Sequence, residues 1–266
     1  MPSYKNKYNF NGESHNFWET LYVLDGSVCV SANEKVYNLS EGDIVFHEPL
    51  ELHKFYTTSP NTKLLIFSFD LEGNLSEFFR HKVFNLTKHQ KSIISSMIDY
   101  FKNASKQPEY INPELLTHEE WHQYLTPINT NPIYGQSLVI YIYQLMLSLV
   151  DNSNRAHSDK SHDSTLFRSA VKYMNENISS SICVSDIAKN INISVSGLKR
   201  IFEKYAGMGV HKYFLTLKLN AATELLESGC SVSEVTASLG FSSSSYFSKV
   251  YKRELNRSPS HIKLKK

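Results

Sequence analysis

The stretch VSEVTASLGFS, from Val232 to Ser242, decides the fold because it is the second copy of a pattern. The first copy, VSDIAKNINIS from Val184 to Ser194, precedes it by 48 residues. After one inserted residue the alignment continues, with LKRIFEKYAGMGV from Leu198 matching FSKVYKRELNRSP from Phe247 at an offset of 49. Self-similarity of this kind indicates that one structural unit is used twice.

Each copy predicts a short helix, a tight turn and a second helix. The first helices carry an acid in their first turn, Asp186 and Glu234. Ser231, three residues before Glu234, gives the spacing of a capping box, which supplies acceptors to free backbone N–H groups. In the turn Gly240 can adopt a positive φ at no steric cost, and the first copy has the tolerant residue Asn192 there. These features are typical of a helix-turn-helix unit.

The second helix of each copy has an inward and an outward face. The inward residues are apolar: Leu198, Ile201, Phe202 and Tyr205, then Phe247, Val250, Tyr251 and Leu255. The outward residues are polar or charged: Ser196, Lys199, Arg200 and Glu203, then Ser244, Ser245, Lys249 and Lys252. One such pattern alone is typical of a solvated helix, but here it coincides with the repeat and with the local charge.

Charge is distributed unevenly along the chain of 266 residues, whose formal net charge is +2. Residues 1–164 hold 13 Lys and Arg against 19 Asp and Glu, a net charge of −6. Residues 165–266 hold 15 against 7, a net charge of +8. This is the electrostatic footprint of a nucleic-acid binder, although a solvated face or a membrane-surface patch fits it too.

The segment between the two copies, Gly209 to Gly229, predicts a helix with glycine at both ends. Its roughly 18 helical residues would span about 27 Å. Equivalent positions in successive major grooves of B-DNA are about 34 Å apart. A helix of this length can therefore set two recognition helices in successive major grooves on one side of the duplex.

The C-terminal part, about residues 166–264, resembles the DNA-binding domain of the AraC/XylS family of bacterial transcription regulators. The family signature fits this chain at Lys218-Leu219, Ala222, Leu226, Val232, Val235-Thr236, Gly240-Phe241, Phe247, Tyr251, Asn256 and Ser258-Pro259. Two positions depart from it: Asn256 replaces the usual Gly, and Cys183 stands where a capping Ser or Thr is expected. Neither threatens the fold, since Asn tolerates a left-handed backbone and a lost cap costs about 1 kcal/mol.

The resemblance also implies which side chains approach DNA. The matching positions are Ser196, Lys199 and Arg200 in the first copy and Ser244, Ser245, Tyr246 and Lys249 in the second, with Lys252 as a further contact. Arg200 and Lys199 can donate to guanine O6 and N7, whereas serine hydroxyls serve base edges and phosphates alike. We therefore expect the first copy to discriminate bases and the second to favour phosphate contacts and DNA shape.

The N-terminal part alternates like a sheet. Between Thr20 and Pro49 short apolar runs are punctuated by Asp25-Gly26, Ala32-Asn33 and Glu41-Gly42-Asp43, as in a small β-barrel. About residues 12–72 resemble the cupin-like sensor domain of the same regulators, through HNFWETLYVLDG and LSEGDIVFHEPLELHKF. The predicted fold class is multidomain α+β: a cupin-like β-barrel with following helices, then an all-α domain with two helix-turn-helix units joined by a long helix.

A polar stretch divides the chain. Residues 151–164 have no apolar periodicity and predict a linker. Residues 1–150 are expected to form the sensor and dimerisation domain, with the barrel at about 12–72 and a helical part at about 76–150. Residues 165–266 are expected to form the DNA-binding domain.

The helical part contains the most apolar run of the chain, Ser137 to Val150, which is shorter than the roughly 20 residues of a bilayer span. It predicts a buried helix and no membrane partner. In similar regulators such helices form the dimer interface, and the apolar face of Leu138 to Val150 suits that role or burial against the barrel. Four prolines between Lys106 and Pro132 predict a loop-rich excursion with a short helix near Trp121.

Cysteine usage and the N-terminus indicate a cytoplasmic protein. Cys29, Cys183 and Cys230 lie far apart and form no C-x-x-C pair, which fits a reducing compartment. The first 15 residues contain no apolar h-region of a secretion signal.

The barrel raises the question of a bound metal or ligand. Catalytic cupins hold a metal with two or three His and a carboxylate, and His15, Glu19, His47 and His53 lie near the corresponding segments. The paired His-x-His is missing, so the ligand set is incomplete and we expect no metal, no cofactor and no catalytic residue. A sensing pocket in the barrel mouth is favoured instead, with candidates His15, Trp18, Glu19, Tyr22, His53 and Tyr56. Trp18 and Tyr22 fit core aromatics equally well.

Together these features predict a sequence-specific DNA-binding regulator that is not an enzyme. The expected protein is an activator that responds to an unidentified small-molecule effector, acts on promoter DNA as a homodimer and works with RNA polymerase. Two alternatives stay open: a cupin-type metalloenzyme with a DNA-binding tail, and a regulator whose barrel only dimerises and binds no ligand.

Overall fold

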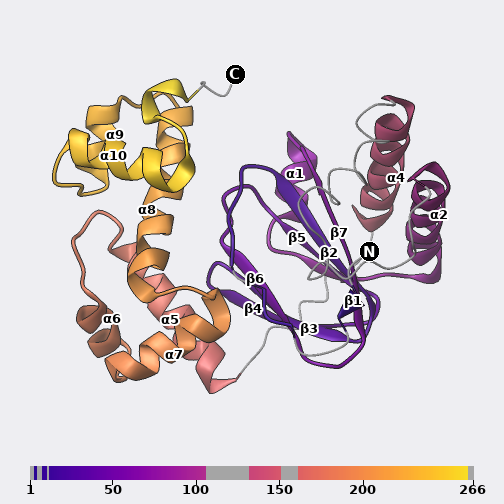
Figure 1. The fold of residues 1–266 in the computed structure, drawn as a ribbon, viewed down its shortest axis with the longest axis horizontal. Coiled ribbons are helices and arrows are strands. Elements are labelled where there is room, and N and C mark those ends of the chain that lie inside the picture. Colours follow the sequence, from indigo (N-terminus) through magenta and orange to yellow (C-terminus); the bar gives the residue numbers. More distant parts are fainter. Residues whose placement is uncertain (1–2, 5–7, 11, 106–131, 151–160, 263–266) are drawn as a thin grey trace.

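The computed structural model describes residues 3–4, 8–10, 12–105, 132–150 and 161–262. Figure 1 shows a β-rich part, formed by the N-terminal half of the chain, beside a helical part formed by the C-terminal third. The predicted loop-rich excursion with its helix near Trp121, and most of the predicted linker, lie outside the described residues.

The described strands of the β-rich part form two antiparallel sheets. Their bounds are β1 Ser3–Tyr4, β2 Trp18–Asp25, β3 Ser27–Ala32, β4 Lys35–Ser40, β5 Asp43–His47, β6 His53–Thr57, β7 Thr62–Phe69 and β8 Val83–Asn85. The larger sheet has the order β1-β7-β2-β5-β8 and the smaller one β4-β3-β6. Apolar side chains of both sheets fill the space between them, among them Leu21, Val30 and Phe55. The predicted barrel is therefore present as a sandwich of two sheets with a packed interior.

Helices cover the outer face of the larger sheet. They are α1 Asn74–Phe79, α2 Lys88–Ser105 and α4 Pro132–Val150. Trp18 and Tyr22 belong to the core between this sheet and the helices, because side chains alternate across β2. The prediction of a mainly helical segment is wrong at β8, where Val83 and Phe84 pair with Val45 and Ile44 of β5. Pairing with an open sheet edge overrides local helical pattern there.

One face of α4 is not buried, which corrects the prediction of a buried helix. Ile140 is 67% exposed and Leu147 is 61% exposed, whereas Leu145, Met146 and Leu149 pack into the core. Among the described helices, α4 alone is long and apolar enough to span a membrane, judged by length and composition over Ile133–Val150. An exposed apolar face of this kind is typical of a surface that contacts another molecule.

The helical part contains the two predicted helix-turn-helix units. Its elements are α5 His162–Glu176, α6 Val184–Asn190, α7 Val195–Ala206, α8 Val210–Glu227, α9 Val232–Ser238, α10 Ser244–Leu255 and a 3-10 turn at Pro259–His261. α5 begins inside the predicted linker, because the side chain of Ser161 caps it by accepting from Ser164 N–H. The expected turn residues are confirmed, with Asn192 at φ 57° and Gly240 at φ 61°.

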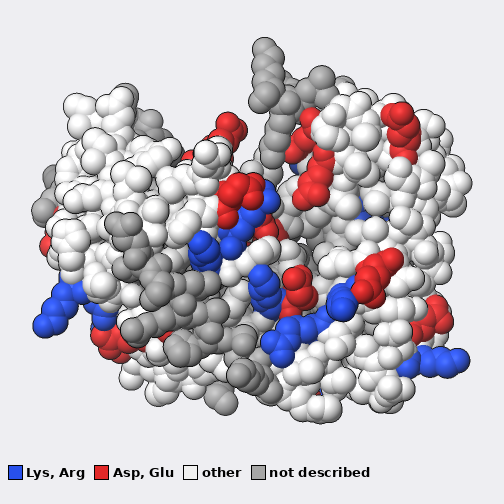
Figure 2. All heavy atoms as spheres, turned by 180° about the vertical axis from the view of Figure 1, so that it is seen from behind, with Lys and Arg blue, Asp and Glu red and all other residues white. Residues whose placement is uncertain are grey.

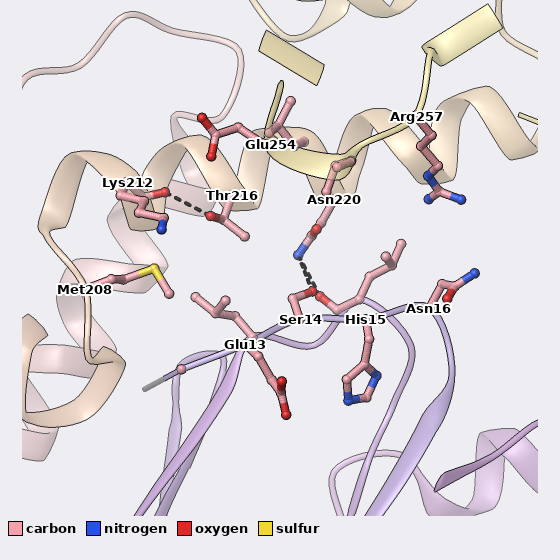
Figure 3. A pocket seen from close by; sticks show the side chains of 15 residues that line it. Glu13, Ser14, His15, Asn16, Met208, Lys212, Thr216, Asn220, Glu254 and Arg257 are labelled. Carbon is pink, nitrogen blue, oxygen red and sulfur yellow. Dashed lines mark hydrogen bonds between the residues drawn. The ribbon is translucent and has the colours of Figure 1, made fainter. Parts of the chain in front are cut away.

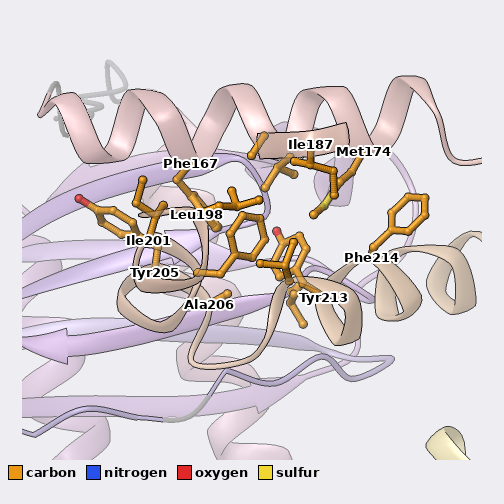
Figure 4. Close-up of a cluster of buried hydrophobic side chains, with 14 of the residues drawn as sticks. Phe167, Met174, Ile187, Leu198, Ile201, Tyr205, Ala206, Tyr213 and Phe214 are labelled. Carbon is orange, nitrogen blue, oxygen red and sulfur yellow. The ribbon is translucent and has the colours of Figure 1, made fainter. Parts of the chain in front are cut away.

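The predicted connecting helix is present as α8, 18 residues long. Its first half packs into a core with α5, α6 and α7 (Figure 4). In that core Phe167, Phe202 and Tyr213 meet edge to face. Its second half packs with α9 and α10 through Leu219 and Leu226. Each helix-turn-helix unit therefore has its own core on the same helix.

Lys218 joins the two units at the middle of α8. Its ammonium group donates to Ser180 O, before α6, and to Leu239 O, at the end of α9, both at 2.9 Å. The side chain is 7% exposed and its Nζ lies over the rings of Phe214 and Phe241. Gly240 completes this junction, since any Cβ there would collide with the backbone carbonyl of Ser179.

We expect Gly240→Ala to lower the free energy of unfolding by about 2 kcal/mol, because it combines a left-handed backbone with a backbone clash. Thermal unfolding of the full chain, followed by circular dichroism, measures the effect. Gly135→Ala is the matched control: Gly135 lies in α4 with open space around it, so alanine there is neutral or slightly stabilising. Equal melting temperatures for Gly240→Ala and the unchanged protein would contradict a tight junction.

Candidate nucleic-acid interface and sensor site

The first predicted DNA contact surface lies on α7. Ser196, Lys199 and Arg200 are all exposed on the side of α7 that faces away from its core. Ser194 caps the helix by accepting from Gly197 N–H at 3.1 Å, and its hydroxyl lies 3.0 Å from the exposed hydroxyl of Ser196. Arg200 reaches Asp163 at 3.5 Å, an exposed pair of little energetic weight that leaves the guanidinium free to exchange partners.

The second predicted surface lies on α10. Ser245, Tyr246, Lys249 and Lys252 are exposed, and Ser244 is half-buried. Within the four consecutive serines it is Ser243 that caps the helix, accepting from Tyr246 N–H at 3.1 Å. The neighbouring hydroxyls therefore flank a helix N-terminus, the end of a helix that favours oxyanions such as phosphate.

The β-rich part forms hydrogen bonds with the C-terminal end of α7. Lys54 of β6 donates from Nζ to Glu203 O at 2.7 Å, and the Ser31 hydroxyl of β3 donates to Tyr205 O. Cys29, Val36 and Leu52 extend the hydrophobic core of the first unit onto the outer face of the smaller sheet. The helix α7, which carries the first predicted DNA contact surface, is therefore in direct contact with the β-rich part.

A cavity of 470 Å³ lies between the two parts (Figure 3). One wall is the segment from Gly12 to Asn16, which leads into β2, and the other is α8 with Lys212, Thr216 and Asn220. The side chain of Asn220 joins the two walls: its Nδ2 donates to Ser14 Oγ at 3.2 Å and to Leu50 O at 2.7 Å. Near the middle of the molecular face shown in Figure 2, Lys and Arg side chains lie beside Asp and Glu side chains.

The structure does not bring the six predicted sensor residues into one pocket. His15 lines the cavity between the two parts. Glu19 and His53 contact the side chain of His15. Trp18 and Tyr22 are core residues on the opposite face of the larger sheet. Tyr56 packs against the core of the first DNA-binding unit. Alternation along β2 and β6 causes this separation, because adjacent residues point to opposite faces.

A polar cluster forms below the cavity. His53 Nε2 lies 3.2 Å from Glu19 Oε1 and 3.8 Å from Glu13 Oε1, and His15 Nε2 lies 3.7 Å from Glu19 Oε2. Burial lowers the pKa of His53, but the carboxylates of Glu13 and Glu19 outweigh burial and raise that pKa to about 10. Burial likewise raises the pKa of Glu19, but the imidazoles of His15 and His53 beside it outweigh burial and hold that pKa well below its usual range.

The sequence prediction overlooked Glu13, which completes this cluster. It stands two residues before His15, at the first position of the expected His-x-His, so Glu-x-His was the available signal. His47, which was among the four candidates, instead pairs with Glu51 at 2.8 Å and stacks on His53. Burial raises the pKa of Glu51, and hydrogen bonds from His47 and His81 outweigh it, so that the pKa falls to about 2.

Comparison with known families matches both parts of the chain. The AraC-like ligand binding domain matches residues 4–87, and a helix-turn-helix domain matches residues 187–264. The first match covers the sheets, and the second covers both helix-turn-helix units with α8 between them.

Relatives match along nearly the whole chain. The Msm operon regulatory protein of Streptococcus mutans is 26% identical, over 96% of this chain and 87% of its own length. The transcriptional activator RhaR of Mannheimia succiniciproducens is 23% identical, over 94% and 85%. The crystal structure of ToxT from Vibrio cholerae aligns with 97% of this chain and 93% of its own, at 14% identity and a TM-score of 0.39.

These relatives are named as transcription regulators, and the order of the two matched domains is the one that the repeat, the basic C-terminal part and the sheet pattern predict. The chain therefore belongs to the AraC/XylS family of DNA-binding transcription regulators, with an AraC-like ligand binding domain followed by a double helix-turn-helix domain.

Proposed function

We propose that this protein is an effector-responsive activator that places α7 and α10 in successive major grooves of a promoter. The observation that carries the proposal is that two exposed recognition surfaces are fixed to one helix, α8, by separate cores and by Lys218. At about 1.5 Å per residue, the 18 residues of α8 span about 27 Å. The two surfaces can therefore meet grooves about 34 Å apart when each recognition helix lies off the end of α8.

The two helices are proposed to do different work. Arg200 and Lys199 can read guanine edges from α7, whereas Ser244, Ser245 and Lys249 of α10 suit phosphate oxygens. Tyr246, 51% exposed, adds an aromatic ring and a hydroxyl to the second surface. Lys252 lies in the last turn of α10, where its charge adds to the field along the DNA backbone.

Arg200→Ala is expected to cost about 1–3 kcal/mol on the preferred site and to relax base preference at one position. Lys252→Ala is expected to weaken binding to all sequences alike and to reduce the salt slope by about 1. Binding curves over base-substituted sites at several salt concentrations separate the two effects. Lys172→Ala, exposed on α5, is the control for loss of charge alone. Equal losses on every sequence for Arg200→Ala would contradict base reading by α7.

The effector is proposed to bind in the cavity between the two parts rather than inside the sandwich. Apolar side chains fill the sandwich interior, whereas the cavity presents Lys212, Thr216 and Asn220 opposite Glu13 and His15. A molecule that touches both walls has different affinities for different domain arrangements, which is the requirement for coupling. Because the barrel also holds the end of α7, such coupling reaches the first recognition helix directly.

A thermal-shift screen of the full chain against sugars, fatty acids and bicarbonate is expected to find a compound that raises the melting temperature, since a ligand stabilises the state it binds. Lys212→Met, which changes the cavity wall, should abolish or reduce that shift. Lys189→Met, exposed on α6 away from the cavity, should leave it unchanged. A hit that stabilises Lys212→Met as much as the unchanged protein would place the site elsewhere, and a screen without hits favours the regulator whose barrel only dimerises.

The protein is proposed to act as a homodimer through the exposed face of α4. Ile133, Val139, Ile140, Tyr143 and Leu147 give that face its apolar character. Its burial in a symmetric contact would remove this surface from water, and a closed two-fold interface uses the same patch on both subunits. The dimeric activator would then hold two DNA-binding domains on a promoter, near RNA polymerase. We further propose that it acts in the cytoplasm and performs no enzymatic step.

Leu147→Glu is expected to convert the dimer into a monomer, because a carboxylate at the centre of an apolar contact loses its hydration. Sedimentation of the full chain measures the change. Ser96→Glu, exposed on the neighbouring helix α2, adds the same charge outside that face and should leave the dimer intact. A monomeric unchanged protein, or a dimeric Leu147→Glu, would remove this interface.

A further inference from the structure

Four side chains with ligand atoms suited to a cation converge below the cavity between the two parts. Glu13, His15, Glu19 and His53 each offer one ligand atom, and these atoms lie within 4.8 Å of one another. They come from the segment before β2, from β2 itself and from β6. The sandwich thus brings together residues that stand up to 40 positions apart in the sequence.

We propose that these four residues bind one divalent cation of the zinc class. A tetrahedral ion with ligands at about 2.1 Å needs ligand atoms about 3.4 Å apart. The three measured separations are 3.2 Å from His53 to Glu19, 3.7 Å from His15 to Glu19 and 3.8 Å from His53 to Glu13. These values bracket the tetrahedral edge, so small side-chain adjustments close the site.

The backbone orients both imidazoles for this role. His15 Nδ1 lies 3.0 Å from Phe17 O, and His53 Nδ1 lies 3.0 Å from Glu51 O. A carbonyl can only accept, so each Nδ1 carries a proton and each Nε2 is directed at the cluster. In the metal-free chain Nε2 of His53 also holds a proton toward Glu19, and the cation would displace that proton. Metal-binding histidines have this arrangement, in which the second ring nitrogen donates to a carbonyl or carboxylate. His15 Nε2 is buried, and no hydrogen bond from the described residues reaches it.

The donor set is compatible with zinc and with a structural role. Two imidazole nitrogens and two carboxylate oxygens suit Zn²⁺, and two carboxylates balance its charge. Four protein ligands fill a tetrahedral shell, whereas catalytic zinc sites keep a position open for water. A cation held by all four residues would therefore stabilise the structure, with no position left open for a reacting water.

A second group of acidic and histidine side chains, Glu48, Glu51 and His81, fits a cation less well. It offers one imidazole, and its carboxylates already have partners, since Arg80 Nε lies 3.0 Å from Glu48 and His47 lies 2.8 Å from Glu51. This group serves as an internal comparison for the first one.

The position of the site gives the cation a structural consequence. Glu13 and His15 flank Ser14, whose hydroxyl accepts from Asn220 of α8. The cation fixes the segment of Ser14 onto β2 and β6, beside the backbone bridge between Glu13 and His53. Metal occupancy therefore strengthens the surface that the DNA-binding domain contacts.

The test uses the full chain, stripped with a chelator and titrated with ZnCl₂ by calorimetry and with CoCl₂ by visible absorption. One equivalent of Zn²⁺ should bind, and Co²⁺ should give the intense visible bands of a tetrahedral site. His15→Gln and Glu19→Gln should each weaken binding by about 100-fold or more, since loss of even an outer-shell partner costs 10–100-fold. His211→Gln, exposed on α8, controls for surface histidines and should bind as the unchanged protein does.

Three results would overturn the proposal: no binding of Zn²⁺ to the unchanged chain, binding by His15→Gln with unaltered affinity, or a larger loss for His81→Asn than for His15→Gln. Melting curves of the metal-free variants check that they fold. His15→Gln is the decisive variant, because His15 lies at the rim of the site and its loss leaves the core intact. DNA binding can persist when Zn²⁺ fails to bind, so failure here leaves the proposed function untouched.

Discussion

The buried ammonium group of Lys218 is the interaction on which the arrangement of the two DNA-binding units depends. A charge in an apolar environment is costly unless hydrogen bonds compensate for it, and burial lowers the pKa of Lys218 accordingly. The carbonyls of Ser180 and Leu239 supply that compensation, and they belong to different helix-turn-helix units. Moving one unit relative to the other would remove one of these two acceptors from the buried charge. α8 therefore connects the two units and, through Lys218 at its middle, also fixes their relative position.

Direct contacts also join the β-rich part to the helical part. The core of the first unit continues onto the outer face of the smaller sheet, and Lys54 and Ser31 bind carbonyls at the end of α7. On the other side of the cavity, Asn220 of α8 binds the segment of Ser14. A ligand or cation between these contacts changes the stability of one domain arrangement, and no long pathway through the protein is needed. Under the proposed function, a ligand would act by changing how firmly the β-rich part holds α7.

Local signals predicted much of the helical domain, and long-range pairing explains what the sequence left out. The capping box at Ser231, the left-handed turns at Asn192 and Gly240 and the length of α8 follow from residues close in sequence. The strand at Val83 depends on an open edge of β5, and the exposed face of α4 depends on how much of that helix the sheet can cover. The split of the predicted sensor residues follows from strand alternation, which fixes faces only once the strands and their partners are known.

The central claim is that α8 sets the two recognition helices one helical turn of DNA apart. Footprinting of the full chain on a promoter found by genome-wide mapping of bound DNA tests it most directly. For each subunit the account predicts two protected major-groove segments on one face of the duplex, with centres about 10 base pairs apart. A single protected segment per subunit, or two segments on opposite faces about half a turn apart, would contradict it.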